Sequence, residues 1–445
     1  MGSARSRVRA QCPDPREAVA VRDAAKPFDA KNLSTVAGAL RRFLDALPPY
    51  RPPEEQVTLL EAGGRVLARE VRAEADVPAF ARATMDGWAV RAADTSPVEP
   101  GIAPVLTVRG QVRMGEAPSV NVGPGEAVWI PTGGMLPAGA DAVLPVESSE
   151  PAGGAGDGGL PAAVKVLAPV RPGENVLPAG ADVAAGRVVL RSGHRLRPQD
   201  VGALAAVGCT APWVFRRPVV AIISSGDELV SPDRQPGPGQ IRDANAYSLA
   251  NAVRNDGGVP RLMGIVPDDP ERLRAAVEKA LANDMVIISG GSSVGRDDMV
   301  ADILSQLGLP GVLVHGVRMA PGKPTILALI GDRVVCGLPG NPVSALVTYE
   351  LFVRPALRWR MGCVPLETWQ PTVRARLGAP LTAPPGRELY ARVRLVVAGG
   401  ELVAQPVPGG SGQLSSLVQA DGLVVVPLER GSLPAGEIVD VRLFG

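Results

Sequence analysis

The central fold of this 445-residue chain is decided by two stretches, VVAIISSGDE at residues 219–228 and MVIISGGSSVG at residues 285–295. In each stretch a short apolar run is followed directly by serine and glycine, which is typical of a buried strand that ends in a tight loop. Helical patterns lie around 245–255, 270–282 and 297–307. This alternation predicts a parallel sheet with right-handed crossovers, whose ligands bind beyond the carboxyl ends of the strands.

Sequence typical of β-structure flanks this alternating region on both sides. Between residues 70 and 170, short apolar runs such as Val105–Val112 and Ala127–Ile130 are separated by Gly/Pro turns, which predicts an all-β module. Residues 151–163 are rich in Gly, Ala and Pro, and this composition predicts a surface loop. Tyr390–Val397 alternates charged and apolar residues as a half-buried strand does, so a second β domain is predicted after about residue 365.

The N-terminal part of the chain predicts helices. Residues 33–47 carry apolar side chains at helical spacing and are followed by Pro48 and Pro49, which end such a helix. A second helix is predicted over 54–68. Residues 1–32 contain several arginines but no apolar segment of a secretory signal, and we expect them to form a disordered tail.

The composition argues against several classes of protein. There are 46 basic and 45 acidic residues, whereas proteins that bind nucleic acids or membrane surfaces generally carry a basic excess. The two histidines are too few for a multi-histidine zinc site, and the four cysteines show no C-x-x-C spacing. No apolar run is long enough to predict a transmembrane helix. Few cysteines in a long chain fit a reducing compartment, so we expect a cytoplasmic protein.

Five loops that leave the predicted sheet are rich in glycine or acidic residues. Glycine lets backbone N–H groups approach phosphate or another oxyanion, and carboxylates at the same edge would repel that anion unless a divalent cation lies between them. The loops therefore predict an anion site with Mg²⁺ bridging phosphates. They span Ser225–Glu228, Pro267–Pro270, Ser289–Asp298, Ala320–Pro324 and Gly337–Ser344.

Two residues in these loops have more specific predictions. One of Asp268 and Asp269 is expected to cap the helix that begins at Pro270, which leaves the other to face the site. Lys323 lies in a Gly/Pro loop, where a compact cation predicts a phosphate or oxyanion contact. Pro324 follows this lysine and prevents a P-loop helix, and no G-x-x-x-x-G-K-[ST] or G-x-G-x-x-G motif is present.

Six motifs in order along residues 33–445 resemble the molybdopterin molybdenumtransferases, the family of the MoeA proteins and the gephyrin E domain. Each motif alone is modest, but their order and spacing are specific. The motifs are ATMDGWAV at 83–90, PTGG at 131–134, SGDEL at 225–229, SGGSSVG at 289–295, PGKP at 321–324 and GLPGNPVS at 337–344.

The resemblance implies a multidomain α/β and β protein. Its central parallel α/β sheet domain would be a MogA-like, molybdopterin-binding domain at 217–365, and a small C-terminal β-barrel domain would occupy 366–445. A β-rich arm is expected from 53–72 with 81–180. A mixed helical linker domain is expected from three separate segments, 33–52, 73–80 and 181–216.

The implied activity is that of a molybdopterin molybdotransferase, which inserts molybdate into adenylylated molybdopterin and releases AMP with the help of Mg²⁺. In the family a site forms where the β-rich arm of one subunit meets the sheet domain of its partner, so the resemblance implies a homodimer. It also implies an upstream molybdopterin adenylyltransferase and downstream molybdoenzymes as partners, with no nucleic acid and no membrane.

The family roles are transferred to individual residues of this sequence. The implied metal ligands are Glu228, Asp268 and Asp298. The implied catalytic set contains these three acids and three further residues, Asp86, Thr132 and Asp182. The full set is therefore Asp86, Thr132, Asp182, Glu228, Asp268 and Asp298. The expected substrate-binding residues are Ser225, Gly226, Asp227, Gly290, Gly291, Ser292, Ser293, Gly295, Gly322, Lys323, Pro339, Gly340, Asn341, Pro342, Arg392 and Ser411.

The sequence departs from the family pattern in ways that keep alternatives open. Leu177 and Ala320 stand where the family usually has a cation, Ala181 stands where it has Glu, and Gly316 replaces a lysine that is sometimes found. Arg296 and Arg318 are neighbouring cations available to replace those lost. The alternatives are a divergent paralogue that handles tungstate or has weak activity, and a molybdopterin-binding scaffold protein.

Overall fold

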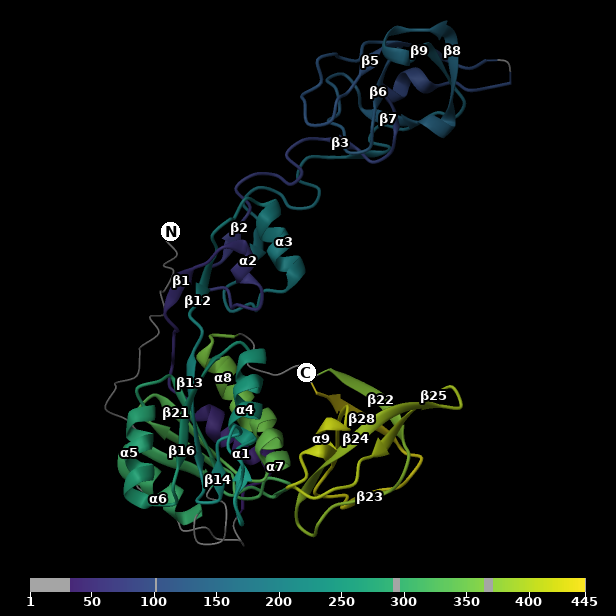
Figure 1. Ribbon diagram of the computed structural model, residues 1–445. Helices are drawn as coiled ribbons and strands as arrows, with labels where there is room; N and C mark the ends of the chain where they lie inside the picture. Colours follow the sequence, from purple (N-terminus) through teal and green to yellow (C-terminus); the bar gives the residue numbers. More distant parts are fainter. Residues whose placement is uncertain (1–32, 101, 291–296, 364–370, 445) are drawn as a thin grey trace, which may run out of the picture. The chain divides into compact units, whose positions relative to one another are not determined.

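The computed structural model describes residues 33–100, 102–290, 297–363 and 371–444 (Figure 1). The chain divides into two compact units, one made of Met1–Pro53 with Phe215–Gly445 and the other of Glu54–Val214. Each unit has its own sheets and hydrophobic cores. None of the described helices combines the length and the apolar character that are needed to span a bilayer.

The first unit contains a six-stranded sheet with the order β16-β13-β17-β21-β20-β18. Strands β16, β13, β17 and β21 run parallel to one another, as the alternating sequence predicts. The apolar runs of β13, β17 and β21 are buried because helices cover both faces of such a sheet, whereas β16 at its edge is largely exposed. The strands are β13 (Val219–Ser225), β16 (Val259–Val266), β17 (Met285–Gly290), β18 (Pro310–His315), β20 (Ile326–Ile330) and β21 (Arg333–Leu338).

Helices α5 and α6 pack on one face of this sheet, with Leu273, Val277 and Leu304 in the shared core. Helices α4 and α7 contact each other, and Figure 1 shows them on the opposite side of the sheet from α5. The helices on the two sides of this sheet and after it are α4 (Asn245–Asn255), α5 (Pro270–Ala280), α6 (Asp297–Leu307), α7 (Pro342–Thr348), the π-helix η4 (Tyr349–Val353) and α8 (Arg354–Arg360).

One strand departs from the expected parallel arrangement. Strand β20 is antiparallel to both of its neighbours, β18 and β21. Only Gly331 and Asp332 separate β20 from β21, and a two-residue connection makes an antiparallel hairpin, whereas parallel neighbours need a long crossover. The sheet is therefore mixed at the β20 position, although the carboxyl ends of β13, β17 and β21 still lie at one edge.

The predicted first helix is present as α1 (Val36–Asp45). Its N-cap Thr35 accepts a hydrogen bond from the Gly38 N–H. Ser34 forms a parallel bridge with Val317, so this segment packs in the first unit beside β18. Residues 33–52 therefore lie with the α/β layer, where we had expected them in the helical linker domain.

The C-terminal segment forms the expected small barrel. Five strands pair in the order β24-β25-β22-β28-β26, and the barrel is closed because β24 also pairs with β26. The short strand β19 pairs with the beginning of β24. Val393, Ala404 and Val441 are fully buried in its core. The elements are β19 (Met319–Ala320), β22 (Thr372–Leu377), β23 (Leu381–Thr382), β24 (Glu388–Ala398), β25 (Glu401–Pro406), α9 (Ser415–Val418), β26 (Gly422–Val426), β27 (Ser432–Leu433) and β28 (Ile438–Leu443).

The second unit contains the predicted β-rich arm, a six-stranded sheet with the order β7-β4-β6-β5-β9-β8. Residues 151–163 are not a loop throughout, because they contribute to the antiparallel strands β8 and β9. Paired strands satisfy the backbone of this small-residue segment even though it offers few side chains for packing. The elements are β3 (Arg82–Ala83), β4 (Gly87–Val90), η1 (Ala92–Thr95), β5 (Val105–Gln111), β6 (Glu126–Ile130), β7 (Ala142–Pro145), η2 (Val146–Ser148), β8 (Ser149–Ala155), η3 (Asp157–Gly159), β9 (Pro161–Val166) and β10 (Val176–Leu177).

A small helical part completes the second unit. Its core joins Ala62 and Leu67 to Leu196, Leu204 and Val214, so segment 54–72 packs with 188–214 and not with the arm as we had expected. The predicted helix over 54–68 is reduced to the four-residue α2, since Thr58 and Glu61 form a capping box and Gly63 follows its last residue. The elements are β1 (Glu54–Gln56), α2 (Leu59–Ala62), β2 (Val71–Arg72), β11 (Val188–Leu190), α3 (Pro198–Ala206) and β12 (Trp213–Phe215).

Candidate functional site

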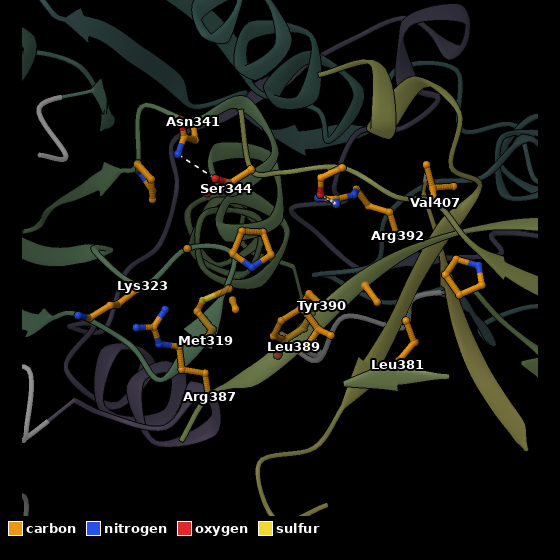
Figure 2. Close-up of a pocket in the computed structure, with 18 of the residues that line it drawn as sticks. Met319, Lys323, Asn341, Ser344, Leu381, Arg387, Leu389, Tyr390, Arg392 and Val407 are labelled. Atoms are coloured by element: carbon orange, nitrogen blue, oxygen red, sulfur yellow. Dashed lines mark hydrogen bonds between the residues drawn. The ribbon is translucent and has the colours of Figure 1, made fainter. Parts of the chain in front are cut away.

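A cleft of about 820 Å³ lies between the α/β layer and the barrel in the first unit (Figure 2). We call it the cationic pocket, because Lys323, Arg387 and Arg392 line it and no carboxylate does among the described residues. Six predicted substrate-binding residues line it, namely Gly322, Lys323, Pro339, Asn341, Arg392 and Ser411. Its other lining residues include Met319, Ala320, Ser344, Leu381, Arg387, Leu389, Tyr390 and Val407.

Arg392 reaches the pocket from barrel strand β24. One terminal nitrogen of its guanidinium donates a hydrogen bond to the carbonyl of Gly409, while its Nε is buried and has no hydrogen-bond partner in the described structure. Burial lowers the pKa of Arg392 from its usual value, because desolvation disfavours the charged form. An anion in the pocket would offset this penalty by accepting charge-assisted hydrogen bonds.

The loop that carries Lys323 is held in shape by its glycine. Gly322 has a φ of +113°, and a Cβ at this position would lie 2.6 Å from Cγ2 of Thr348 and 2.9 Å from Cε of Met319. Thr325 Oγ1 donates a 2.7 Å hydrogen bond to the Gly322 carbonyl, and the Lys323 carbonyl accepts one from the Val317 N–H at 2.8 Å. These contacts fix the backbone from which the lysine extends into the pocket.

The opposite rim joins the turn before α7 to the barrel. Asn341 Nδ2 donates a 2.9 Å hydrogen bond to Oγ of Ser411, and the Val343 N–H donates to the Ser411 carbonyl at 3.0 Å. Two predicted binding residues from distant parts of the chain are therefore in direct contact. Pro342, the first residue of α7, fixes the start of this helix because its ring presets a helical φ.

The predicted acidic loops meet at the ends of β13 and β16. Ser225 Oγ donates a 3.0 Å hydrogen bond to Oδ1 of Asp268, and the Asp268 N–H donates to Oδ1 of Asp227 at 3.1 Å. Asp269 caps α5 by accepting a 2.8 Å hydrogen bond from the Arg272 N–H. Asp268 is thus the residue of the pair that faces the loop, and Asp269 is the cap.

Two glycines let these loops approach one another. Gly290 has a φ of +115°, and a Cβ there would lie 2.0 Å from the Ser225 carbonyl oxygen, so any other residue would clash with backbone. At Gly226 a Cβ would lie 2.6 Å from Oε2 of Glu228, which shows that this exposed carboxylate folds back over the loop. Ser225, Gly226, Asp227, Glu228 and Asp268 therefore form one cluster, which we call the acidic cluster.

Asn245 links the sheet end near the acidic cluster to the rim of the cationic pocket, and our sequence reasoning missed it. Its Nδ2 donates to Oγ of Ser289 at 2.9 Å and to the Gly340 carbonyl at 2.7 Å. The local signal is the helix start, where Asp243 Oδ1 accepts a 3.0 Å hydrogen bond from the Ala246 N–H. That pattern predicts a helix beginning but not a side chain that bridges two strand ends.

Of the three predicted metal ligands, the structure describes the side chains of Glu228 and Asp268. Within those residues, no group of three His, Cys, Asp or Glu side chains is arranged to hold a metal ion. Asp298 lies in the first turn of α6, but its side chain is outside the described part, as are residues Gly291, Ser292, Ser293 and Gly295. Glu228 and Asp268 offer oxygen donors of the kind that Mg²⁺ prefers.

The other predicted catalytic residues lie in the second unit. Asp86 Oδ1 accepts hydrogen bonds from the N–H and from the hydroxyl of Thr132, at 2.6 and 2.8 Å. The backbone bond and then the hydroxyl bond lower the pKa of Asp86. Asp182 is exposed near the paired Val77, and no hydrogen bond of the described residues joins its side chain to the Asp86–Thr132 pair.

Family models match three successive parts of the chain. The MoeA N-terminal region (domain I and II) matches residues 34–208, and a probable molybdopterin binding domain matches residues 221–359. The MoeA C-terminal region (domain IV) matches residues 374–444.

Similar proteins cover nearly the whole chain. A molybdopterin molybdenumtransferase of Nostoc sp. is 36% identical over 86% of this chain and 87% of its own length. Molybdopterin molybdenumtransferase 2 of Mycobacterium tuberculosis is also 36% identical, over 86% of this chain and 94% of its own. A molybdopterin biosynthesis MoeA protein from Pyrococcus horikoshii has a crystal structure that matches with a TM-score of 0.75 and 31% identity, covering 93% of this chain and 100% of that one.

Proposed function

Because the chain belongs to the MoeA family of molybdopterin molybdenumtransferases and so to molybdenum cofactor biosynthesis, we propose that it inserts molybdate into adenylylated molybdopterin with release of AMP. The observation that carries this proposal is the cationic pocket, where Lys323, Arg387 and Arg392 line a cleft without any carboxylate among its described lining residues. Molybdate is a tetrahedral dianion, and converging cations and amide donors are the groups that bind such an ion.

Each rim of the pocket would contribute a different function to this reaction. Lys323 on its rigid loop and Arg392 with its buried Nε would hold the oxyanion. Asn341 and Ser411 would orient it through their linked polar groups. Leu381, Leu389 and Val407 give the same cleft an apolar wall, which suits the uncharged part of an organic substrate and excludes water.

The acidic cluster is the place for Mg²⁺ in this proposal. Glu228 and Asp268 would hold it, with Asp298 as the third predicted ligand. A bound Mg²⁺ supplies positive charge that neutralises phosphate oxygens. The reciprocal hydrogen bonds between Asp227 and Asp268 keep the loops in place, so the protein itself positions these oxygens.

We also propose that the site is completed across a homodimer. The Asp86–Thr132 pair belongs to the second unit, and exposed apolar side chains lie near it, since Met85 is 39% and Met114 is 60% exposed and Cε of Met114 approaches Gly133. An exposed apolar patch beside a polar pair is typical of a surface that a partner covers. Mixing Asp86→Ala with Glu228→Ala chains tests this, because a mixed dimer would regain one intact site.

The expected recovery is roughly a quarter of wild-type activity after statistical subunit exchange in a symmetric dimer. Each variant alone should remain inactive but dimeric by light scattering. If the mixture stays as inactive as the separate variants although mixed dimers form, the shared site is excluded.

The proposal places the reaction in the cytoplasm, because Cys209, Cys336 and Cys363 are free thiols. An upstream adenylyltransferase and downstream molybdoenzymes remain proposed partners.

The decisive experiment is to incubate the purified protein with adenylylated molybdopterin, Mg²⁺ and molybdate, and to measure AMP. We expect AMP release that depends on molybdate. Binding of the nucleotide substrate without AMP release would contradict the enzyme and favour a scaffold role. The same assay with tungstate tests the divergent-paralogue alternative, which Ala320 in the pocket wall keeps open.

A further inference from the structure

The cationic pocket contains a cation that the sequence did not single out. Ala320 lines the pocket and has no charged side chain. Arg387 lines the same pocket and belongs to the segment that leads into β24. The two are brought together by strand pairing, because β19 runs parallel to β24 with Met319 opposite Glu388 and Ala320 opposite Leu389. The Glu388 N–H donates a 2.9 Å hydrogen bond to the Arg318 carbonyl, which fixes this register beside Arg387.

The guanidinium of Arg387 is available for a ligand. Among the described residues, no hydrogen bond or ion pair is made by its side chain, whereas Arg376 and Arg430 of the barrel pair with carboxylates and Arg392 with a carbonyl. The neighbouring acid Glu388 does not line the pocket, and its carboxylate accepts a hydrogen bond from the Tyr390 hydroxyl. Figure 2 shows the Arg387 guanidinium and the Lys323 ammonium extending to the same side of the cleft past Met319.

The two cations that the sequence offered as replacements do not fill this place. Arg318 does not line the pocket, and Arg296 lies outside the described residues. The charged groups that face the cleft in the described structure are therefore Lys323, Arg387 and Arg392, all of one sign. Like charges that line one cleft repel each other, and an anion bound between them reduces that repulsion.

We propose that Arg387 is an oxyanion-binding residue that replaces the cation missing at Ala320, and that it sets the affinity of the pocket for a tetrahedral dianion. This inference rests on the proposed function, since molybdate is that dianion there. The planar guanidinium can donate two parallel hydrogen bonds to two oxygens of one tetrahedral ion, which a lysine at position 320 would not do. Arg387 would therefore add geometric selection as well as charge.

The test is equilibrium dialysis of radioactive molybdate with the full chain, which needs no turnover. Arg387→Ala should weaken molybdate binding about tenfold, the usual effect of losing one charge-assisted contact. Arg394→Ala is the matched control, because Arg394 lies on β24, the strand that follows Arg387, is exposed and does not line the pocket. This variant should bind molybdate as the wild type does. The double variant Ala320→Lys/Arg387→Ala should recover much of the lost affinity.

The outcomes separate this inference from the proposed function. If Arg387→Ala is folded by circular dichroism and binds molybdate as tightly as the wild type, the inference is wrong even when AMP release is normal. If the wild type binds molybdate through Arg387 but never releases AMP, the proposed reaction fails while the binding residue stands. In an active enzyme, Arg387→Ala should raise the KM for molybdate and leave kcat nearly unchanged, whereas a merely structural role would lower kcat and thermal stability together.

Discussion

The cationic pocket and the acidic cluster occupy neighbouring parts of the same sheet edge, yet their charges are satisfied in opposite ways. In the acidic cluster, Asp268 already accepts hydrogen bonds from Ser225 and Asp227. In the cationic pocket, Arg387 has no partner among the described residues and Arg392 keeps a buried Nε without one. The carboxylates thus organise loops before any ligand binds, while Arg387 and the buried Nε of Arg392 are left for a ligand to satisfy.

The largest expected effect comes from removing a pocket cation. Arg392→Ala should lower kcat/KM for molybdate about a hundredfold, because it deletes both the charge and the contact that anchors the Gly409 loop. Initial rates of AMP release measure this, and the exposed Arg394→Ala variant should keep wild-type rates. A loss below twofold would show that the Arg392 guanidinium does not contact the substrate, and the contrast between the two regions would then fail.

The next effect concerns the rigidity of the pocket loop. Gly322→Ala should destabilise the protein by about 2 kcal/mol, because its Cβ would clash with Thr348 and its positive φ disfavours a side chain. Gly386→Ala is the matched control, since Gly386 also has a positive φ but has open space around it, and only about 1 kcal/mol is expected there. Urea unfolding compares the two, and equal losses would contradict the packing argument.

A smaller effect is expected in the acidic cluster. Ser225→Ala removes the hydroxyl donor to Asp268 and should lower the free energy of unfolding by about 1 kcal/mol, measured by urea unfolding. Because one oxygen of Asp268 then loses a competing donor, the Mg²⁺ concentration for half-maximal activity should change. An unchanged Mg²⁺ dependence would argue that Asp268 is an organiser of the loop and not a metal ligand.

The smallest effect is a change in titration in the second unit. Thr132→Val removes the hydroxyl bond to Asp86 but keeps the backbone bond, so the pKa of Asp86 should rise and stay below its usual value. Since the folded-state pKa is depressed, the stabilisation is complete above the unfolded pKa and is lost as pH falls through the folded pKa. A carbon-13 NMR titration of the Asp86 carboxyl group measures this. An unchanged pKa would show that the hydroxyl is not a partner in solution.

Much of the fold and half of the pocket were predictable because they depend on local signals. The apolar runs ending in serine and glycine marked β13 and β17, and the Asp-Pro pair marked the start of α5. The glycine and lysine of the loop at 321–324 predicted an anion contact, and both line the cationic pocket. The reversed direction of strand β20 was not predicted, because an apolar run has the same pattern in either direction.

The domain boundaries show a second kind of error. Segment 54–72 lies next to the arm in sequence, but Ala62 and Leu67 pack with Leu196 and Leu204. Burial of apolar side chains decides this association, and the partner of an amphipathic segment cannot be read from its own residues. Helix α1 joined the α/β layer for the same reason.

By itself, the sequence determined the strands, the helix starts, the glycine loops and the family, because each follows from local backbone preference or from ordered motifs. Only the tertiary structure decided which side chains meet. It brought Asn341 to Ser411, let Asn245 bridge two strand ends, and placed Arg387 beside the uncharged Ala320 through the pairing of β19 with β24. These contacts join residues far apart in the chain, so they depend on sheet register and on closure of the barrel, which no local pattern encodes.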